Sequence, residues 1–207
     1  MRKHNVSETK MILEPLKRAL RNPKKNPNDV VLPRGTNFIA LRNANFARGA
    51  GRLDLLIISD EPSLILVEAK KASNVELKHA SAGQLLLYYA HALKASVKNL
   101  QIELVRVAAK KWQRGVGLDK ICEKAGVTRE QVFKWLKDAK HRAHSRAHRN
   151  LRTIRAFVAV NSWNEKRDGV RLGKIIRLLQ KYGLPFGVVV CSRRRSRLKI
   201  PKGLGIK

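Results

Sequence analysis

Two acidic residues interrupt apolar runs that otherwise have the composition of buried strands. Asp54 stands within residues 53–58, and Glu68 stands near the end of residues 64–70. Burying two carboxylates together is costly unless a cation neutralises them, and hard oxygen ligands at a partly hydrated site favour Mg²⁺ or Mn²⁺. Such an ion would polarise a phosphate and activate water, so the pair predicts phosphodiester hydrolysis. Lys70, on the same strand face as Glu68, could orient that water or stabilise the developing charge.

The carboxylates can meet only if two adjacent strands position them. Residues 60–63, Asp-Glu-Pro-Ser, form a turn signal between the two apolar runs. They predict an antiparallel hairpin of strands 53–59 and 64–70. Apolar spacing before the hairpin predicts a helix over residues 7–20, with Ser7 as N-cap, and extended segments at 30–32 and 38–41. After it we expect a helix over 79–93, with Leu86, Ala90 and Leu93 as its apolar stripe, and a strand at 102–107.

The composition is strongly basic. The 207 residues include 45 Lys and Arg against 15 Asp and Glu, a formal net charge of +30. Nucleic acid is the commonest polyanion that offsets such a charge. Hydrophobic residues make up 43%, which excludes a disordered basic tail as a description of the whole chain. No apolar run approaches the roughly 18–20 residues of a membrane span, and no secretory signal or cysteine framework is present. We expect a cytoplasmic, DNA-associated protein with no membrane partner.

The spacing of the candidate site resembles a known superfamily. Asp54, thirteen residues and then Glu68-Ala69-Lys70 is similar to the motif of the PD-(D/E)xK nucleases. The α-β-β-β-α-β order of that superfamily matches the elements expected over residues 7–108. Gln84 and Tyr88, four positions apart on an expected helix, match the Q-x-x-x-Y element of its RecB-like and its viral or archaeal Holliday-junction-resolvase-like members.

The resemblance implies a fold and a set of roles. The fold class is α/β, a restriction-endonuclease-like core with a mixed central sheet flanked by helices and a small all-helical insert. The implied catalytic residues are Asp54, Glu68, Lys70, Glu14, Gln84 and Tyr88, and the implied ligands of Mg²⁺ or Mn²⁺ are Asp54, Glu68 and the main-chain carbonyl of Ala69. Glu8 is the second candidate for the first-helix glutamate, after Glu14. Leu53 stands where the name-giving proline would be. The alternative interpretation is a strand-edge charge at Asp54 and a surface ion pair of Glu68 with Lys70.

A second pattern predicts a helix-turn-helix over residues 118–137. Apolar residues recur at helical spacing, Gly126 stands at the turn, and Thr128 with Gln131 forms a capping box that begins the second helix. The residues expected to bind nucleic acid are Arg129, Lys134, Lys137, Arg142, Arg146 and Arg149. An ordinary helical hairpin packed on the sheet is the alternative.

The remaining chain supplies more cations and closes the core. Lys140 belongs to a basic row over residues 140–155, in which we expect His141, His144 and His148 to be solvated rather than metal-bound. Strands at 154–160 and 186–191 around a helix at 172–182 predict a βαβ unit. Beyond Asp168 the chain has 11 Lys and Arg and no acid. The expected organisation is therefore a first core segment (1–111), the insert (112–150), and the closing βαβ unit with a basic tail (151–207).

These patterns predict a divalent-metal-dependent DNA endonuclease. Cleavage could be structure-specific, at junctions or flaps, or site-specific, as in restriction-like and homing-like enzymes. A homodimer is expected, because one metal cluster hydrolyses one strand at a time. A non-catalytic DNA-binding regulator on a nuclease-like scaffold is the alternative from another class. An RNA-binding protein is less favoured, because an aromatic content of 5% offers few stacking platforms.

Overall fold

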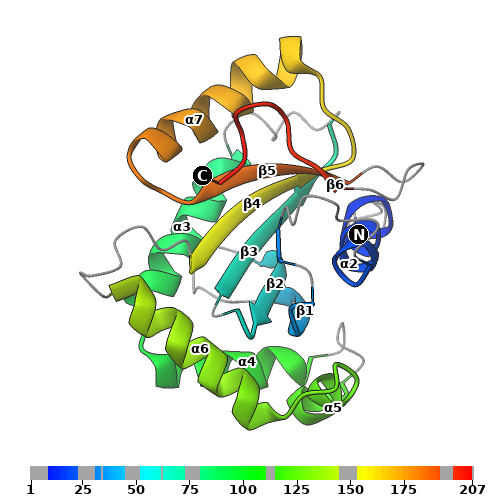
Figure 1. The fold of residues 1–207 in the computed structure, drawn as a ribbon, viewed down its shortest axis with the longest axis vertical. Coiled ribbons are helices and arrows are strands. Elements are labelled where there is room, and N and C mark those ends of the chain that lie inside the picture. Colours follow the sequence, from blue (N-terminus) through cyan, green and yellow to red (C-terminus); the bar gives the residue numbers. More distant parts are fainter. Residues whose placement is uncertain are drawn as a thin grey trace. The chain divides into compact units, whose positions relative to one another are not determined.

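The computed structural model of the chain describes residues 9–22, 31–33, 35–44, 52–61, 63–72, 80–110, 115–144, 153–191 and 198–206. The fold is α/β, with a mixed six-stranded sheet whose strands follow one another in chain order from β1 to β6 (Figure 1). The chain forms two compact units. One comprises residues 1–35, 67–85 and 156–207, and the other comprises residues 36–66 and 86–155.

The unit of residues 36–66 and 86–155 is built on an antiparallel strand pair. β1 (Phe38–Ala44) pairs with β2 (Leu53–Ser59), from Phe38 opposite Ser59 to Ala44 opposite Leu53. β3 (Ser63–Lys70) begins in this unit, and the Leu64 amide donates to the Thr153 carbonyl at 2.6 Å. That bond places the start of β3 beside the residues that lead into β4 (Ile154–Val160).

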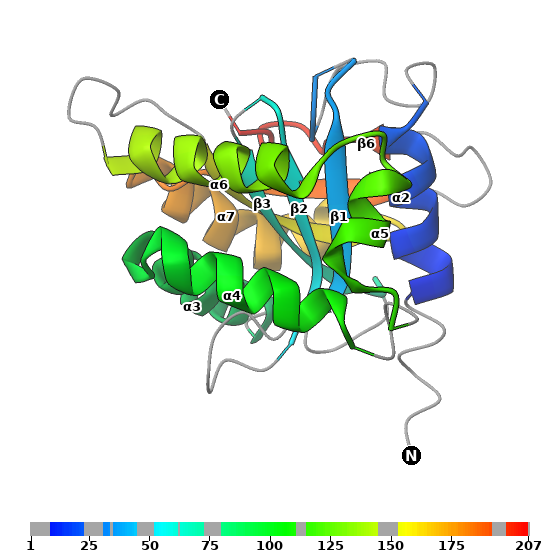
Figure 2. The ribbon, with the colours of Figure 1, turned by 90° about the horizontal axis from the view of Figure 1, so that it is seen from below.

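Three helices of the same unit cover this strand pair. They are α4 (Val97–Ala108), α5 (Gly117–Glu123) and α6 (Arg129–His144). α4 contacts β1, α6 contacts β2, and the three helices contact one another, as Figure 2 shows. The buried residues of α6 recur at helical spacing, Val132, Trp135, Leu136 and Ala139, because one face of the helix packs on the strands.

The prediction of a strand at residues 102–107 is wrong, because this segment lies within α4. The Ser96 hydroxyl caps the helix and accepts a hydrogen bond from the Asn99 amide at 3.2 Å. Leu100 and Leu104 are buried one turn apart, whereas Ile102 is 47% exposed. The branched residues that suggested a strand are therefore divided between the two faces of an amphipathic helix.

The preceding helix is present, but the predicted apolar stripe is on the wrong face. α3 (Ala80–Lys94) matches the expected range within the described residues. Leu86 is 39% exposed and Ala90 is also exposed. Its buried side chains are instead Ala82, Leu85, Tyr88, Tyr89 and Ala92. The buried face of α3 is thus shifted by about one residue from the predicted stripe. The prediction counted only aliphatic residues and overlooked the large apolar surface of the two tyrosines.

The other unit contains the expected βαβ arrangement. β4 pairs in parallel with β5 (Phe186–Cys191), and β5 pairs antiparallel with β6 (Leu198–Lys199). The crossover consists of a π-helical stretch, η6 (Glu165–Gly173), that continues into α7 (Lys174–Lys181). It ends at Gly183, whose φ of 76° suits glycine.

The N-terminal segment of this unit is helical, as expected. It consists of η1 (Thr9–Leu13) and α2 (Glu14–Leu20), and the predicted cap Ser7 lies outside the described residues. The extended segment predicted at 30–32 is not a strand at residues 31 and 32, which form a bend, and residue 30 is not described. In the described ranges, no helix is long and apolar enough to cross a bilayer.

Candidate active site

A charged pair lies inside the otherwise apolar strand β3. Glu68 is 2% exposed, and every residue of β3 from Ser63 to Ala69 is buried. The Lys70 ammonium lies 3.1 Å from Glu68 Oε1, and the lysine side chain is 13% exposed. Residues two apart in a strand point to the same face, which explains why the two side chains meet. Glu68 is therefore buried and Lys70 is largely covered, unlike the surface ion pair of the alternative interpretation.

Asp54 is the second residue of β2. It is half-buried, between the fully buried Leu53 and Leu55. β2 and β3 are neighbours in the sheet and are joined by residues 60–62. Asp54 belongs to the unit of residues 36–66 and 86–155, whereas Glu68 and Lys70 belong to the other unit.

The other residues implied by the resemblance lie on two helices and on β3. Glu14 is the first residue of α2 and is half-buried. Gln84 is half-buried on α3, and Tyr88 on the next turn is completely buried. Ala69 lies in β3 between Glu68 and Lys70. Glu8 lies outside the described residues.

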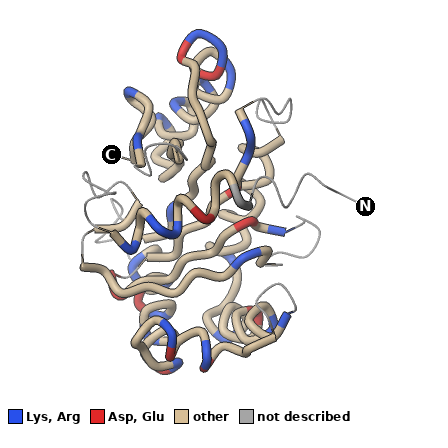
Figure 3. Tube along the Cα trace, turned by 90° about the vertical axis from the view of Figure 1, so that its right-hand side faces the viewer, with Lys and Arg blue, Asp and Glu red and all other residues tan. Residues whose placement is uncertain are grey.

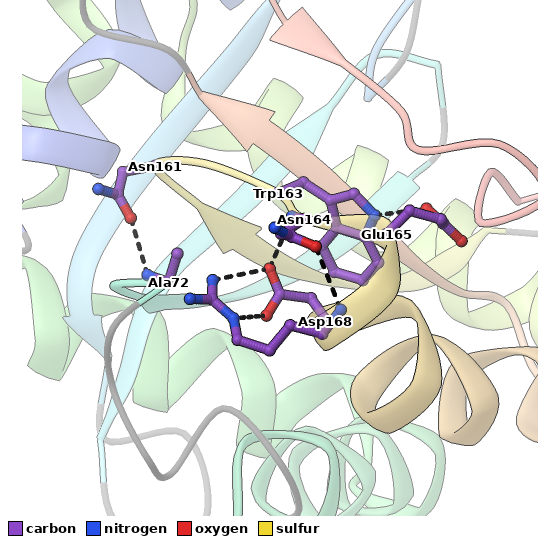
Figure 4. Close-up of polar contacts among 7 residues, drawn as sticks. Ala72, Asn161, Trp163, Asn164, Glu165 and Asp168 are labelled. Carbon is purple, nitrogen blue, oxygen red and sulfur yellow. Dashed lines mark hydrogen bonds and ion pairs between the residues drawn. The ribbon is translucent and has the colours of Figure 1, made fainter.

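A polar cluster that was not among the predicted site residues follows β4. The Asn161 side-chain oxygen accepts a hydrogen bond from the Ala72 amide at 2.8 Å, which joins the end of β4 to the residues just after β3 (Figure 4). The Asn164 side chain caps η6 and accepts from the Arg167 amide at 3.2 Å. An asparagine directly before a helix is a recognisable N-cap signal, and it could have indicated this helix start.

Asp168 is the buried centre of this cluster. It is 3% exposed and accepts hydrogen bonds from Arg167 Nε at 2.6 Å, Arg167 Nη2 at 3.1 Å and the Asn164 amide at 2.8 Å. Burial raises the pKa of this carboxyl, but the hydrogen bonds and the positive charges of Arg167 and Arg171 outweigh it and hold the pKa below its ordinary value. Asp168 is therefore a charged anchor for the start of η6.

Trp163 is oriented by a short chain of polar contacts in the same cluster. Its indole N–H donates to Glu165 Oε2 at 2.7 Å, and Arg177 Nη2 donates to Glu165 Oε1 at 3.1 Å (Figure 4 shows the first of these contacts). The hydrogen bond from Trp163, helped by the contact with Arg177, lowers the pKa of Glu165 against the opposing effects of burial and of the Asp168 charge. Trp163 itself is half-buried.

The expected turn between two helices is present at α5 and α6. Gly126 has a φ of 70°, which suits glycine at a tight turn. The predicted capping box is confirmed: the Gln131 amide donates to Thr128 Oγ1 at 3.2 Å, and the Thr128 amide donates to Gln131 Oε1 at 2.7 Å. The start of α6 thus follows from local sequence, and its buried face follows from its contact with β2.

The cations predicted to bind nucleic acid differ in their surroundings. Lys134, Lys137 and Arg142 are exposed on α6. Arg129 lies 3.7 Å from Asp119 and 5.2 Å from the centroid of the Phe133 ring. Arg146 and Arg149 lie outside the described residues. Figure 3 shows that Lys and Arg outnumber Asp and Glu along the described trace.

Lys140 is not part of an exposed basic row, contrary to expectation. It is 5% exposed, and its ammonium donates to the carbonyls of Ala92 at 2.7 Å and Leu93 at 2.5 Å. Burial lowers the pKa of Lys140. The side chain therefore closes the C-terminus of α3, where carbonyls lack helical partners.

The histidines on α6 show no metal-binding arrangement. His141 and His144 are exposed, and His144 Nδ1 lies 2.9 Å from the Lys140 carbonyl. His148 lies outside the described residues. Among the residues that the structure describes, no three His, Cys, Asp or Glu side chains gather to hold a metal ion.

Comparison with known proteins gave no relative. No family model, no curated protein and no solved structure matches this chain.

Proposed function

We propose that this chain is a divalent-metal-dependent deoxyribonuclease of the PD-(D/E)xK type. The observation that carries the proposal is the ion pair of buried Glu68 and half-buried Lys70 on β3. An acid and a lysine placed in an apolar strand cost stability relative to apolar residues of the same size. A catalytic role would explain why the strand keeps these charged residues despite the loss of stability. The motif Glu68-Ala69-Lys70 suggests which role that is.

The donor atoms suit a hard divalent cation. On the neighbouring strands β2 and β3, Asp54 and Glu68 supply the two candidate carboxylates. With the Ala69 carbonyl they would offer three oxygen ligands, leaving the other positions of an octahedral ion to water and substrate. This set has only two carboxylates, so it does not require a cluster of three acidic side chains. When bound, Mg²⁺ or Mn²⁺ would polarise the phosphate and lower the pKa of the attacking water.

The protein's own groups have separate tasks in this proposal. Glu68 and Asp54 hold negative charge at the site and bind the cation. The Lys70 ammonium lies 3.1 Å from Glu68 Oε1 and would present a positive charge where the phosphate develops negative charge. Gln84 lies on the helix that follows the motif, and its amide would contact the DNA backbone.

The basic surface would bind the substrate. The net charge of +30 favours a polyanion, and Lys134, Lys137 and Arg142 are exposed on α6. Cleavage of both strands would use two copies of the chain related by a two-fold axis. The proposed enzyme is therefore a DNA endonuclease that acts as a homodimer, on junctions, flaps or another defined structure.

A cleavage assay on a panel of DNAs tests the proposal. The purified chain is incubated with blunt duplex, flap, four-way junction and single-stranded DNA, in Mg²⁺, in Mn²⁺ and in EDTA. We expect products in either metal and none in EDTA, and we expect Glu68→Gln to remove them. Absence of products on every substrate, at protein concentrations that saturate binding, would overturn the proposal.

A non-catalytic DNA-binding regulator is the second candidate. It is favoured by the helix pair α5 and α6, with its capping box and the exposed lysines of the second helix. A regulator would bind DNA without cleaving it, and its affinity would not respond to metal. The same assay therefore separates the two candidates, provided that binding is measured beside cleavage.

A further inference from the structure

The tryptophan after β4 is held in one orientation although it lies outside the core. Trp163 is half-buried, whereas Trp135 on α6 is 9% exposed and belongs to the core. The Trp163 N–H is bound to Glu165, which is in turn held by Arg177. The loop is anchored at the Asn161 side chain and at buried Asp168 (Figure 4). Such fixing of a large aromatic side chain suits a binding surface, because little conformational entropy is lost when a ligand stacks on it.

This loop starts close to the residues that follow the candidate catalytic lysine. The Asn161 side chain binds the Ala72 amide, and Ala72 is two residues beyond Lys70. Two residues of chain span at most about 7 Å on each side of this bond, and the bonded amide and side chain add roughly 8 Å between the Cα atoms of Ala72 and Asn161. The Cα atoms of Trp163 and Lys70 are therefore at most roughly 22 Å apart. About six nucleotides of a B-form strand cover that length. One DNA strand can therefore reach both residues.

The charges around the loop favour an anionic ligand. Cationic side chains are exposed on η6 and α7, the helical segment that follows the loop: Lys166, Arg167, Arg171, Lys174 and Lys181. The carboxylate of Glu165 lies against Arg177 at 3.1 Å, and that of Asp168 lies against Arg167 at 2.6 Å. The nearby acids are therefore largely neutralised, and the remaining charge is positive.

We infer that Trp163 is a stacking platform for an unpaired nucleobase of the DNA strand that the site cleaves. The inference rests on the proposed function, since it names the feature of DNA that this same site would recognise. The N–H edge of the indole is occupied by Glu165, so the ring offers its face rather than a hydrogen bond. Every base has a π face, and stacking on it tolerates any sequence. A base in a duplex has both faces covered by its neighbours, so the platform selects flaps and single strands.

Affinity measured in EDTA tests the inference without cleavage. Fluorescence anisotropy gives the Kd of wild-type protein, Trp163→Ala and Trp163→Phe for a single-stranded oligonucleotide and for the blunt duplex of the same sequence. We expect Trp163→Ala to weaken single-strand binding by roughly 5- to 150-fold, the range for removal of one base–aromatic stack. Its duplex affinity should stay within twofold. Trp163→Phe, which keeps an aromatic face, should retain single-strand affinity within a few fold.

Three controls make the result decisive. Tyr182→Ala removes another exposed aromatic ring, 75% exposed at the end of α7, and should change neither affinity. The slope of affinity against salt should be unchanged in Trp163→Ala, because the indole neutralises no phosphate. Thermal unfolding checks that each variant is folded, and Trp163→Leu replaces Trp163→Ala if the alanine variant is not.

The outcomes separate this inference from the proposed function. An equal decrease in affinity for single strand and duplex, or no decrease for either, overturns the inference. If wild-type protein cleaves no DNA in metal but Trp163→Ala loses single-strand affinity selectively, the stacking platform stands and the nuclease proposal fails. If the wild-type protein cleaves DNA and the alanine variant binds both DNAs normally, only the platform fails.

Discussion

At the scale of single residues, two ion pairs contain a carboxylate that is buried in the fold, and the two pairs differ in what explains them. The ion pair of Asp168 and Arg167 fixes the start of η6. The hydrogen bonds that the Asp168 carboxylate accepts stabilise its charged form and lower its pKa. Glu68 and Lys70 form an ion pair near the end of β3, in a strand that is otherwise apolar apart from Ser63. The first pair is explained by the local structure, and for the second pair we propose a role in catalysis.

Substitutions at the candidate site should separate chemistry from binding. Asp54→Ala, Glu68→Gln and Lys70→Ala should each lower the cleavage rate by roughly 100-fold or more, since each removes a charge from the reacting centre. DNA affinity should change by only a few fold, because the basic surface carries it. Single-turnover cleavage and anisotropy measure the two quantities. Glu61→Gln, at a half-exposed acid near the turn, serves as the matched control, and a full cleavage rate in Glu68→Gln would contradict the assignment.

Asp168 should make the stability of the fold depend on acid. Its pKa is lower in the folded chain than in the unfolded chain, so the stabilisation is present above about pH 4, the unfolded value, and is lost as the pH falls through the folded value. Asp168→Asn should lower the free energy of unfolding by about 1–3 kcal/mol at pH 7, because it removes charged hydrogen bonds. Urea unfolding at pH 7 and at pH 3 measures the difference between wild type and variant. A difference that is equally large at both pH values would show that the charge of Asp168 is not its cause.

At the scale of elements, the sequence predicted helices and strands well where a single local pattern determines them. The bounds of β2, β4 and β5 and the capping box of α6 follow from apolar runs, turn residues and a four-residue motif. The helix α4 was mistaken for a strand because its branched residues were counted without their spacing. The anchoring of Asn161 to Ala72, across 89 positions, could not be predicted, because no local pattern links residues so far apart in sequence.

The candidate site shows the same division. Alternation along β3 predicted that Glu68 and Lys70 share a face, and the structure brings them together. The burial of Tyr88 and of Lys140 depends on which helix face packs inward, and that is decided by tertiary contacts. A basic residue in a row at helical spacing is expected to be exposed. Lys140 is an exception, because the end of α3 has carbonyls at Ala92 and Leu93 that accept hydrogen bonds from its ammonium.

Lys140 should act on stability and not on DNA binding. Lys140→Met keeps the length of the side chain but leaves the Ala92 and Leu93 carbonyls without their donor, which should cost about 1–3 kcal/mol. Chemical unfolding measures the decrease, with Lys120→Met, at an exposed lysine of α5, as the matched control. DNA affinity at a temperature where both variants are folded should remain within twofold. A large drop in affinity in folded Lys140→Met would place this ammonium on the DNA.

The exposed lysines of α6 should have the opposite effect. Lys134→Ala with Lys137→Ala should leave the free energy of unfolding within about 0.5 kcal/mol, as is usual for exposed sites. The double variant should bind DNA more weakly and reduce the slope of log affinity against log salt by roughly 2, because each lysine neutralises one phosphate. An unchanged slope would show that α6 serves only to cover β2.

At the scale of the whole molecule, the excess of 30 positive charges should dominate association with DNA. If about 6–8 phosphates are contacted, raising the salt concentration from 50 to 200 mM should weaken binding by on the order of a thousandfold or more. Anisotropy titrations at four salt concentrations measure this slope. A flat dependence would show that the charge serves a partner other than nucleic acid.

The order of the sheet has a consequence for synthesis of the chain on the ribosome. The strands are added in chain order, so β3 is the outer strand of the growing sheet until β4 has been made. β3 ends at Lys70 and β4 begins at Ile154. At about 5–20 residues per second, the intervening segment takes roughly 4–17 s to synthesise. During that interval an apolar strand has an unpaired edge, which is the form in which nascent chains pair with one another. Translation speed over α3 to α6 should therefore influence how much of the protein is recovered in soluble form.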